Sequence, residues 1–295
     1  MWAFRAMGYA VFSFCSLLLT RPSLDTPDNL VVAFILLSAG VLLRIASGAD
    51  NWRHYAMLGV FLGGGYLAKA IMFPLAFCFL AVSPFAGRNF LRGLTRSLIA
   101  ALVFLLISVP LLMALSQNKG RFTFGDSGRI AYAEYIDRVP LYNHWQGLPP
   151  GTGTPKHPTR ELLHSPQIFE FATPVQGTYP PWYEPSYWYD GVRPTFHLGS
   201  QITAIRFGVD KYFEIFSQLG CLFGSLIVFV LLEFSPADFF REFRKTYLLW
   251  IPAIAALAMY SLIHVEDRFL GGFLLLLWAA AFMSVRITSA QRSVT

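Results

Sequence analysis

Three short polar stretches, each between apolar runs, carry the residue types that could do chemistry. LDTPDNL holds Asp25 and Asp28, Lys69 interrupts a long apolar run, and HVEDRF holds His264 and Arg268. A carboxylate can orient or deprotonate a hydroxyl group, whereas a lysine and an arginine suit a phosphate as a point charge and a bidentate fork. The types and spacing therefore predict an anion site at a membrane boundary. Simple pairing of these charges with one another, or their solvation in wet turns, is the structural alternative.

A proline-rich aromatic segment, FATPVQGTYPPWYEPSYWYDG at residues 171–191, is the second candidate. Its prolines exclude a long helix, because each one removes a backbone donor and fixes its own φ. Tyrosine and tryptophan rings can contact a sugar or a prenyl chain, and they also form belts at membrane interfaces. Both interpretations stay open at this point. The rings in question are Tyr179, Trp182, Tyr183, Tyr187 and Trp188.

Other kinds of site find little support. The six histidines show no paired-ligand spacing, and the three cysteines lie in apolar runs, so no metal site is expected. The sequence contains no Gly-x-Ser-x-Gly elbow and no phosphate loop. The net charge of +6 is spread along the chain, which argues against a nucleic-acid partner. Apart from Lys69, no charge lies at the middle of the clearest apolar runs, which makes an ion-coupled transporter a poor alternative.

The composition predicts an all-α polytopic membrane protein. The chain is 55% hydrophobic and only 14% charged, against roughly 25% charged residues in soluble domains. Residues 55–86 are too long for one straight span and are predicted to be a hairpin of two short helices, about 55–68 and 70–86, with Lys69 at the turn. With it, about eight helices are expected; the other six cover about 3–20, 28–45, 98–116, 209–232, 247–263 and 269–285.

The distribution of basic residues predicts the topology. Arginine and lysine concentrate on connections that all become cytoplasmic if the N-terminus is inside, which places both termini in the cytoplasm. The expected organisation is N-terminal membrane helices in 1–116, an irregular extracytoplasmic loop subdomain in 117–208, and C-terminal membrane helices in 209–295. No Asn-x-Ser/Thr sequon is present, and the predicted location is a bacterial inner membrane. A signal peptide over residues 1–20 is the less favoured alternative.

The arrangement resembles the polytopic GT-C glycosyltransferases, in particular the bacterial aminoarabinose and protein O-mannosyl transferases. The similar pieces are TPDNLVVAFILLSAGVLLR at 26–44, MLGVFLGGGYLAKAIMFPLAF at 57–77, the long outer loop, and YSLIHVEDRFLGGFLLLLW at 260–278. The resemblance implies transfer of a sugar from a polyprenyl-phosphate carrier to an acceptor at the outer face of the membrane. Sugar, acceptor and cofactor stay unassigned, with a divalent cation open.

The resemblance also implies roles for individual residues. Asp28 or Asp25 would be an acid of the catalytic site, while Lys69, Arg268 and His264 would hold the carrier phosphate. The family begins with a helix and an outer loop that carries a first acid, and this chain has no counterpart to them. The expectation is therefore a truncated or split transferase, with a partner chain that supplies the missing part. A non-catalytic membrane scaffold of an envelope complex is the alternative.

Overall fold

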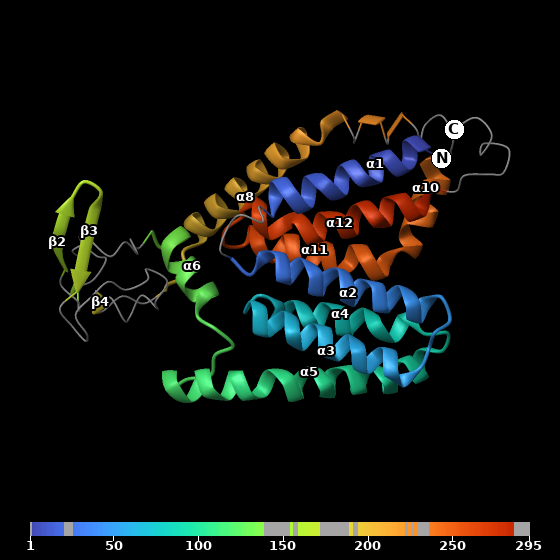
Figure 1. The fold of residues 1–295 in the computed structure, drawn as a ribbon, viewed down its shortest axis with the longest axis horizontal. Coiled ribbons are helices and arrows are strands. Elements are labelled where there is room, and N and C mark those ends of the chain that lie inside the picture. Colours follow the sequence, from blue (N-terminus) through green and yellow to red (C-terminus); the bar gives the residue numbers. More distant parts are fainter. Residues whose placement is uncertain are drawn as a thin grey trace. The chain divides into compact units, whose positions relative to one another are not determined.

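The computed structural model describes residues 2–20, 26–138, 154–155, 159–171, 189–190, 194–221, 224–225, 227–228 and 236–285. This part of the chain is mostly helical (Figure 1). Three helices are long and apolar enough to cross a membrane, judged by length and composition: Asp28–Ala46, Phe90–Lys119 and Asp267–Ser284. Three shorter apolar helices accompany them, at Arg5–Leu19, Met72–Ala86 and Tyr247–Ser261. The prediction of a helical, membrane-type chain is confirmed at this level.

The chain divides into two compact units. The first, here called the helical unit, comprises Met1–Phe124, Asp210–Met259 and Val265–Thr295. The second, called the loop unit, comprises Gly125–Val209 and Tyr260–His264. The sequence predicts a loop subdomain at 117–208. The loop unit covers a similar stretch and adds Tyr260–His264, which are the last two residues of α11 and the three residues after it.

The helical unit is a bundle in which the helices lie side by side (Figure 1). Helix α3 packs between α2 and α5, α4 packs on α5, and α12 packs on α2 and on the π-helical turn η1. Its elements are α1 (Trp2–Ser13), η1 (Phe14–Leu19), α2 (Asp28–Ala46), α3 (Trp52–Ala68), α4 (Met72–Ala86), α5 (Phe90–Lys119), α10 (Pro236–Lys245), α11 (Tyr247–Ser261) and α12 (Asp267–Ser284).

Glycines on α3 and α12 set how closely these helices approach their neighbours. A Cβ at Gly63 would lie 2.8 Å from the Ile107 side chain of α5, and one at Gly64 would lie 2.7 Å from the Phe34 ring of α2. A Cβ at Gly271 of α12 would lie 2.8 Å from a backbone oxygen of η1. Because a larger residue would force these elements apart, the glycines allow the end of α3 to lie close to α2 and α5, and the start of α12 to lie close to η1.

The predicted break at Lys69 is confirmed. Helix α3 ends at Ala68, Lys69 is its C-cap in an extended conformation, and α4 begins at Met72. The Lys69 amide donates to the carbonyl oxygen of Gly65, and its own carbonyl oxygen accepts from Met72. The run 55–86 is thus two packed helices, as the charge pattern of its flanks had indicated.

One face of α5 has no neighbours among the described residues. Only 17% of its most apolar window is buried inside the structure, although the helix is 30 residues long. Its exposed side chains include Leu98, Leu102 and Leu106. Exposed leucines in such a row suit contact with lipid chains rather than water.

The loop unit is more regular than the sequence had indicated. Helix α6 (Ser127–Tyr135) opens it, and the first turns of α8 (Leu198–Gln218) end its long segment. Strands β2 (Thr159–His164) and β3 (Gln167–Phe171) form an antiparallel hairpin, and β1 (Thr154–Pro155) pairs with β4 (Tyr189–Asp190). The expected irregular loop of an all-α protein is therefore replaced by short paired strands at these residues, because cross-strand pairing, which leaves no helical period, orders them.

Helix α8 also differs from its predicted span. The sequence placed a membrane helix at about 209–232, whereas α8 begins at Leu198 and is described to Gln218. Its early turns carry Arg206 and Asp210, and it does not have the apolar character of the three candidate spans. The count of eight spans accordingly stays a prediction.

Candidate functional site

Asp28 is the centre of the charged cluster. It is the first residue of α2 and its side chain is only 3% exposed. A carboxylate in the first turn of a helix is favoured by the helix dipole, and burial makes its remaining interactions strong. Its Oδ1 accepts a hydrogen bond from Lys69. Its Oδ2 accepts none from any described residue and lies 3.8 Å from Arg268 Nε.

Lys69 reaches Asp28 from the turn between α3 and α4. Its Nζ also lies 4.0 Å from the centre of the Phe269 ring, a cation–π distance. Burial lowers the pKa of Lys69 below its usual value, and the hydrogen bond to Asp28 opposes that shift. The side chain keeps 23% exposure. Lys69 is thus a partly desolvated cation, and only one of its three donor positions is used by a described acceptor.

Arg268 enters the cluster from the first turn of α12. Its Nε donates to Glu266 Oε2 at 2.5 Å, and its guanidinium carbon lies 5.1 Å from the centre of the Phe269 ring. No described residue accepts a hydrogen bond from its two terminal nitrogens. The side chain is 31% exposed. The edge of the guanidinium that binds oxyanions in a bidentate manner is therefore left for another partner.

A third ion pair extends the cluster along α12. Lys211 of α8 lies 3.3 Å from Asp267, and it also donates to Glu214 at 3.0 Å. Glu266, Asp267 and Arg268 are thus consecutive charged residues, and each has an oppositely charged partner in the helical unit. The arrangement joins α2, α3, α8 and α12.

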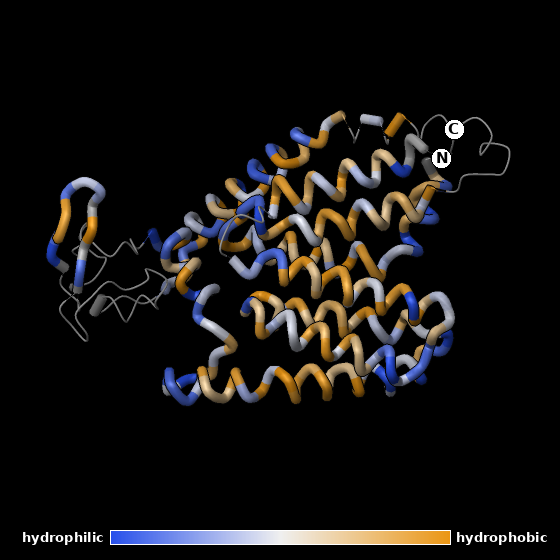
Figure 2. Tube along the Cα trace, in the orientation of Figure 1, coloured by the Kyte–Doolittle hydropathy of each residue, from blue (hydrophilic) through white to orange (hydrophobic). Residues whose placement is uncertain are grey.

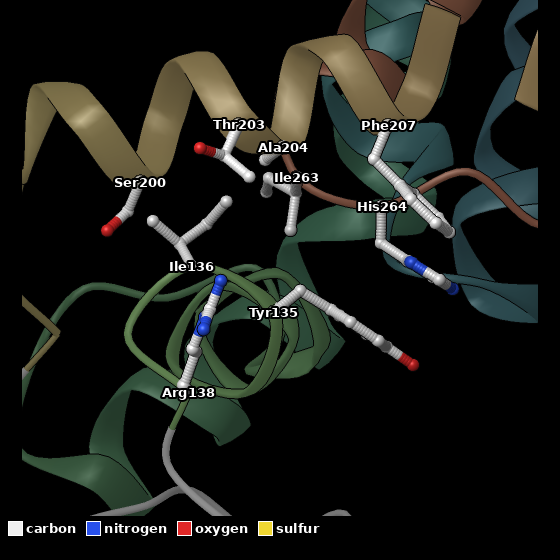
Figure 3. A pocket seen from close by; sticks show the side chains of 9 residues that line it. All are labelled: Tyr135, Ile136, Arg138, Ser200, Thr203, Ala204, Phe207, Ile263 and His264. Carbon is white, nitrogen blue, oxygen red and sulfur yellow. The ribbon is translucent and has the colours of Figure 1, made fainter. Parts of the chain in front are cut away.

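His264 belongs to the loop unit, where it stacks on a ring of α6. The centres of the His264 and Tyr135 rings are 3.6 Å apart and the planes differ by 1°. Both residues line a cavity of about 260 Å³ (Figure 3). Helix α8 contributes one face to it through Ser200, Thr203, Ala204 and Phe207, and Ile136, Arg138 and Ile263 complete the lining. Figure 3 shows the Arg138 side chain beside α6, pointing in the direction of α8.

Several predicted site residues lie outside the described residues. These are Asp25 and the aromatic rings Tyr179, Trp182, Tyr183, Tyr187 and Trp188. The structure therefore brings together Asp28, Lys69 and Arg268 from the predicted set, and it places His264 in the cavity of the loop unit.

Metal ligation has no counterpart within the described part of the chain. No group of three His, Cys, Asp or Glu side chains there is arranged to hold an ion. The carboxylates of the cluster instead face cations: Asp28 faces Lys69, Glu266 faces Arg268, and Asp267 faces Lys211.

Two features were not singled out from the sequence. Phe269 follows Arg268, and its position beside both Lys69 and Arg268 becomes visible only when α12 docks, whereas pairing of Arg268 with an acid of its own turn, here Glu266, was an expected alternative. The α8 face at 200, 203, 204 and 207 has helical spacing, a pattern that could have been read as one side of a helix. It was obscured because the expected span began at 209.

Comparison with known proteins gives no further assignment: no family model, no curated protein and no solved structure matches the chain.

Proposed function

We propose that the protein is a glycosyltransferase-like membrane protein that binds a polyprenyl-phosphate sugar at the cluster of Asp28, Lys69 and Arg268. The carrier phosphate would lie against Lys69 and Arg268, at the outer face of a bacterial inner membrane. The fold expected from the resemblance to GT-C transferases and the charge pattern of the chain support this orientation. The acceptor, the sugar and any metal requirement are left open.

A single observation carries the proposal. Two cations that are held by buried or half-buried carboxylates each keep hydrogen-bond donors without a described acceptor. If Arg268 only neutralised a neighbouring carboxylate, its two terminal nitrogens would not need to stay available as hydrogen-bond donors. A phosphate would use those donors, and it would replace none of the existing hydrogen bonds.

The arrangement suits the chemistry of group transfer from a phosphate carrier. When the bond between the anomeric carbon and the phosphate oxygen breaks, the electron pair leaves with the phosphate. Cations that are fixed beside the phosphate stabilise this developing charge. Phe269 lies against Lys69 and Arg268 and limits the number of positions that the two side chains can take.

Asp28 would act first as a positioning residue. Its 3% exposure leaves little access for an acceptor hydroxyl, whereas its contacts fix both cations. A role for Asp28 as the base that takes the acceptor's proton remains a prediction. That role requires the carboxylate to become accessible when the substrate binds.

The test is binding of polyprenyl phosphate to the purified full chain in detergent. We expect Lys69→Ala and Arg268→Ala to weaken binding by about tenfold each, since a hydrogen bond to a charged group contributes about 1.5–3 kcal/mol. The dephosphorylated polyprenol should bind weakly to all forms. Arg160→Ala serves as the matched control, because Arg160 is a largely exposed cation of the β2–β3 hairpin with its own acidic partner.

Two outcomes would contradict the proposal. Equal affinity of the wild-type protein for polyprenol and polyprenyl phosphate would show that the phosphate is not recognised. Equal loss in Arg160→Ala and in the two cluster variants would show that binding follows overall charge. The melting temperature of each variant, followed by circular dichroism, establishes that the compared proteins are folded.

A scaffold function is the second candidate, and the burial of Asp28 favours it. A carboxylate that is hydrogen-bonded by Lys69 and faces Arg268 can serve to lock three helices together without any ligand. In that case neither polyprenyl phosphate nor polyprenol would bind measurably. A loss of stability in the cluster variants is expected under both functions, so the absence of polyprenyl-phosphate binding is the result that identifies a scaffold.

A further inference from the structure

The end of the helical unit away from Asp28 also concentrates charge. There α2 ends at Ala46, the connection 47–51 leads into α3, and the connection 87–89 joins α4 to α5. Figure 2 shows hydrophilic residues in these connections between apolar helices, and hydrophilic residues alternating with hydrophobic ones in α10. We call this region the basic end.

Specific contacts hold the segments of the basic end together. A Cβ at Gly48 would lie 3.2 Å from Arg88 Nη2, so that side chain lies directly over the first connection. Arg96 of α5 donates to Asp50 Oδ1 at 2.5 Å. The Tyr247 hydroxyl at the start of α11 donates to the Phe85 carbonyl oxygen of α4 at 2.7 Å, which joins the end of α10 to the same region.

The cations of the basic end outnumber its carboxylates. Asp50 is paired with Arg96, Asp238 with Arg241, and Glu242 with Lys245. Five further arginines are exposed and have no carboxylate within 4.0 Å among the described residues: Arg44, Arg53, Arg88, Arg92 and Arg244. The excess positive charge is therefore not neutralised within the described part of the chain.

Exposed aromatic rings lie beside these arginines. Trp52 is 57% exposed, and the guanidinium carbon of Arg53 lies 5.8 Å from the centre of its ring. Phe85 and Phe90 are both exposed, and their ring centres are 4.9 Å apart on either side of the α4–α5 connection. Phe240 of α10 is exposed as well. Rings next to basic groups at the ends of apolar helices are typical of residues at headgroup depth.

We propose that the basic end binds the phosphate headgroups of anionic phospholipids. Arg53, Arg88 and Arg92 are the principal phosphate contacts, and Trp52 and Phe90 insert among the acyl chains next to them. Each arginine near a membrane surface contributes attraction to anionic lipid, and the guanidinium fork matches a phosphodiester. This binding does not depend on the polyprenyl-phosphate proposal, which concerns the other end of α2.

The position of the arginines favours lipid over nucleic acid or an acidic peptide. Arg44, Arg53 and Arg92 lie in the terminal turns of α2, α3 and α5, Arg88 lies in the α4–α5 connection, and Arg244 lies at the end of α10 just before α11. In a bilayer these positions are at the boundary of the hydrocarbon layer. A polymer in solution would have to compete there with the headgroups already present.

The test uses the full chain in bilayers, with Trp52 as the reporter. Quenching by phosphatidylglycerol brominated on its acyl chains is compared with quenching by brominated phosphatidylcholine. Subtracting the signal of the Trp52→Phe variant isolates the reporter. We expect half-maximal quenching of Trp52 at a mole fraction of brominated phosphatidylglycerol about fivefold lower than that of brominated phosphatidylcholine. This factor corresponds to the attraction of one arginine to an anionic membrane surface.

Variants then assign the preference to the basic end. The triple variant R53Q/R88Q/R92Q should bring the two quenching curves together, whereas R53K/R88K/R92K should keep most of the preference. Arg206→Gln, which removes an exposed arginine of α8, should leave it unchanged. Because each result is a ratio of two lipids in one protein, a direct effect of Arg53 on Trp52 emission cancels.

Several results would overturn the proposal. The wild-type protein could show the same quenching by both lipids, or Arg206→Gln could lose the preference to the same extent as the triple glutamine variant. The wild-type protein could also bind a fluorescent oligonucleotide more strongly than anionic lipid. If the triple glutamine variant loses that binding, the basic end belongs to nucleic acid instead.

Discussion

At the scale of single residues, the distinctive feature is a carboxylate that is almost fully buried yet only half satisfied. Asp28 Oδ1 accepts a hydrogen bond from Lys69, whereas Oδ2 accepts none from a described residue and lies 3.8 Å from Arg268 Nε. A buried ion pair contributes little net stability when compared with apolar residues, but the loss of one partner is costly because the other charge stays buried. The cluster is therefore sensitive to single changes and tolerant of paired ones.

A double-mutant cycle tests this coupling. Asp28→Asn and Lys69→Met should each lower the free energy of unfolding by about 3 kcal/mol, since each leaves one buried group without its partner. The double variant should lose less than the sum of the two. Thermal unfolding in detergent, followed by tryptophan fluorescence, measures all four proteins. Strictly additive losses would mean that the two residues do not act as a pair.

At the scale of elements, the close packing of α3 depends on the glycines that lie in contact with a neighbouring helix. Gly59 faces α5 so closely that a Cβ there would lie 2.8 Å from Val103 Cβ. Gly40 lies in α2 with nothing within 4 Å of the same position. The two residues have the same type and the same helical setting, and they differ in contact alone.

This pair gives a matched prediction. Gly59→Ala should destabilise the protein by about 1–3 kcal/mol through overpacking of α3 against α5. Gly40→Ala should be neutral or stabilising by up to about 1 kcal/mol, because alanine favours a helix over glycine. Melting temperatures in one detergent compare them. Similar losses in both variants would show that the α3–α5 contact is looser than described.

At the scale of the whole molecule, α5 connects the basic end of the helical unit to the chain of the loop unit. Its start follows the basic end, and the chain beyond its last residue, Lys119, leads into the loop unit. A 30-residue helix with a largely exposed apolar window is long enough to cross the hydrocarbon layer. A crossing of the membrane by α5 predicts that the connection 47–51 and the β2–β3 hairpin lie on opposite sides.

Cysteine labelling tests this topology. In a chain whose three native cysteines are replaced by alanine, Ser165→Cys in the hairpin should react with a membrane-impermeant maleimide in intact cells. Ser47→Cys in the α2–α3 connection should react only after permeabilisation. Both serines are exposed, so accessibility to solvent does not distinguish them. Labelling of both in intact cells would place the two sites on one side and refute a crossing by α5.

The sequence by itself determined the helical, membrane-type character of the chain and the break at Lys69. Apolar length and the placement of basic residues are local properties, and they act before any helix docks. The same reasoning placed α2, α11 and α12 close to their observed bounds.

Only the tertiary structure decided which charges meet. Asp28, Lys69 and Arg268 are far apart in the sequence, and their contact depends on glycines whose lack of a side chain lets α3 and α12 approach α2. The separation of His264 from Arg268 into different units depends on packing as well. The hairpin β2–β3 was missed because the irregular register between Glu161 and Leu163 interrupts the side-chain alternation by which a strand is recognised in a sequence.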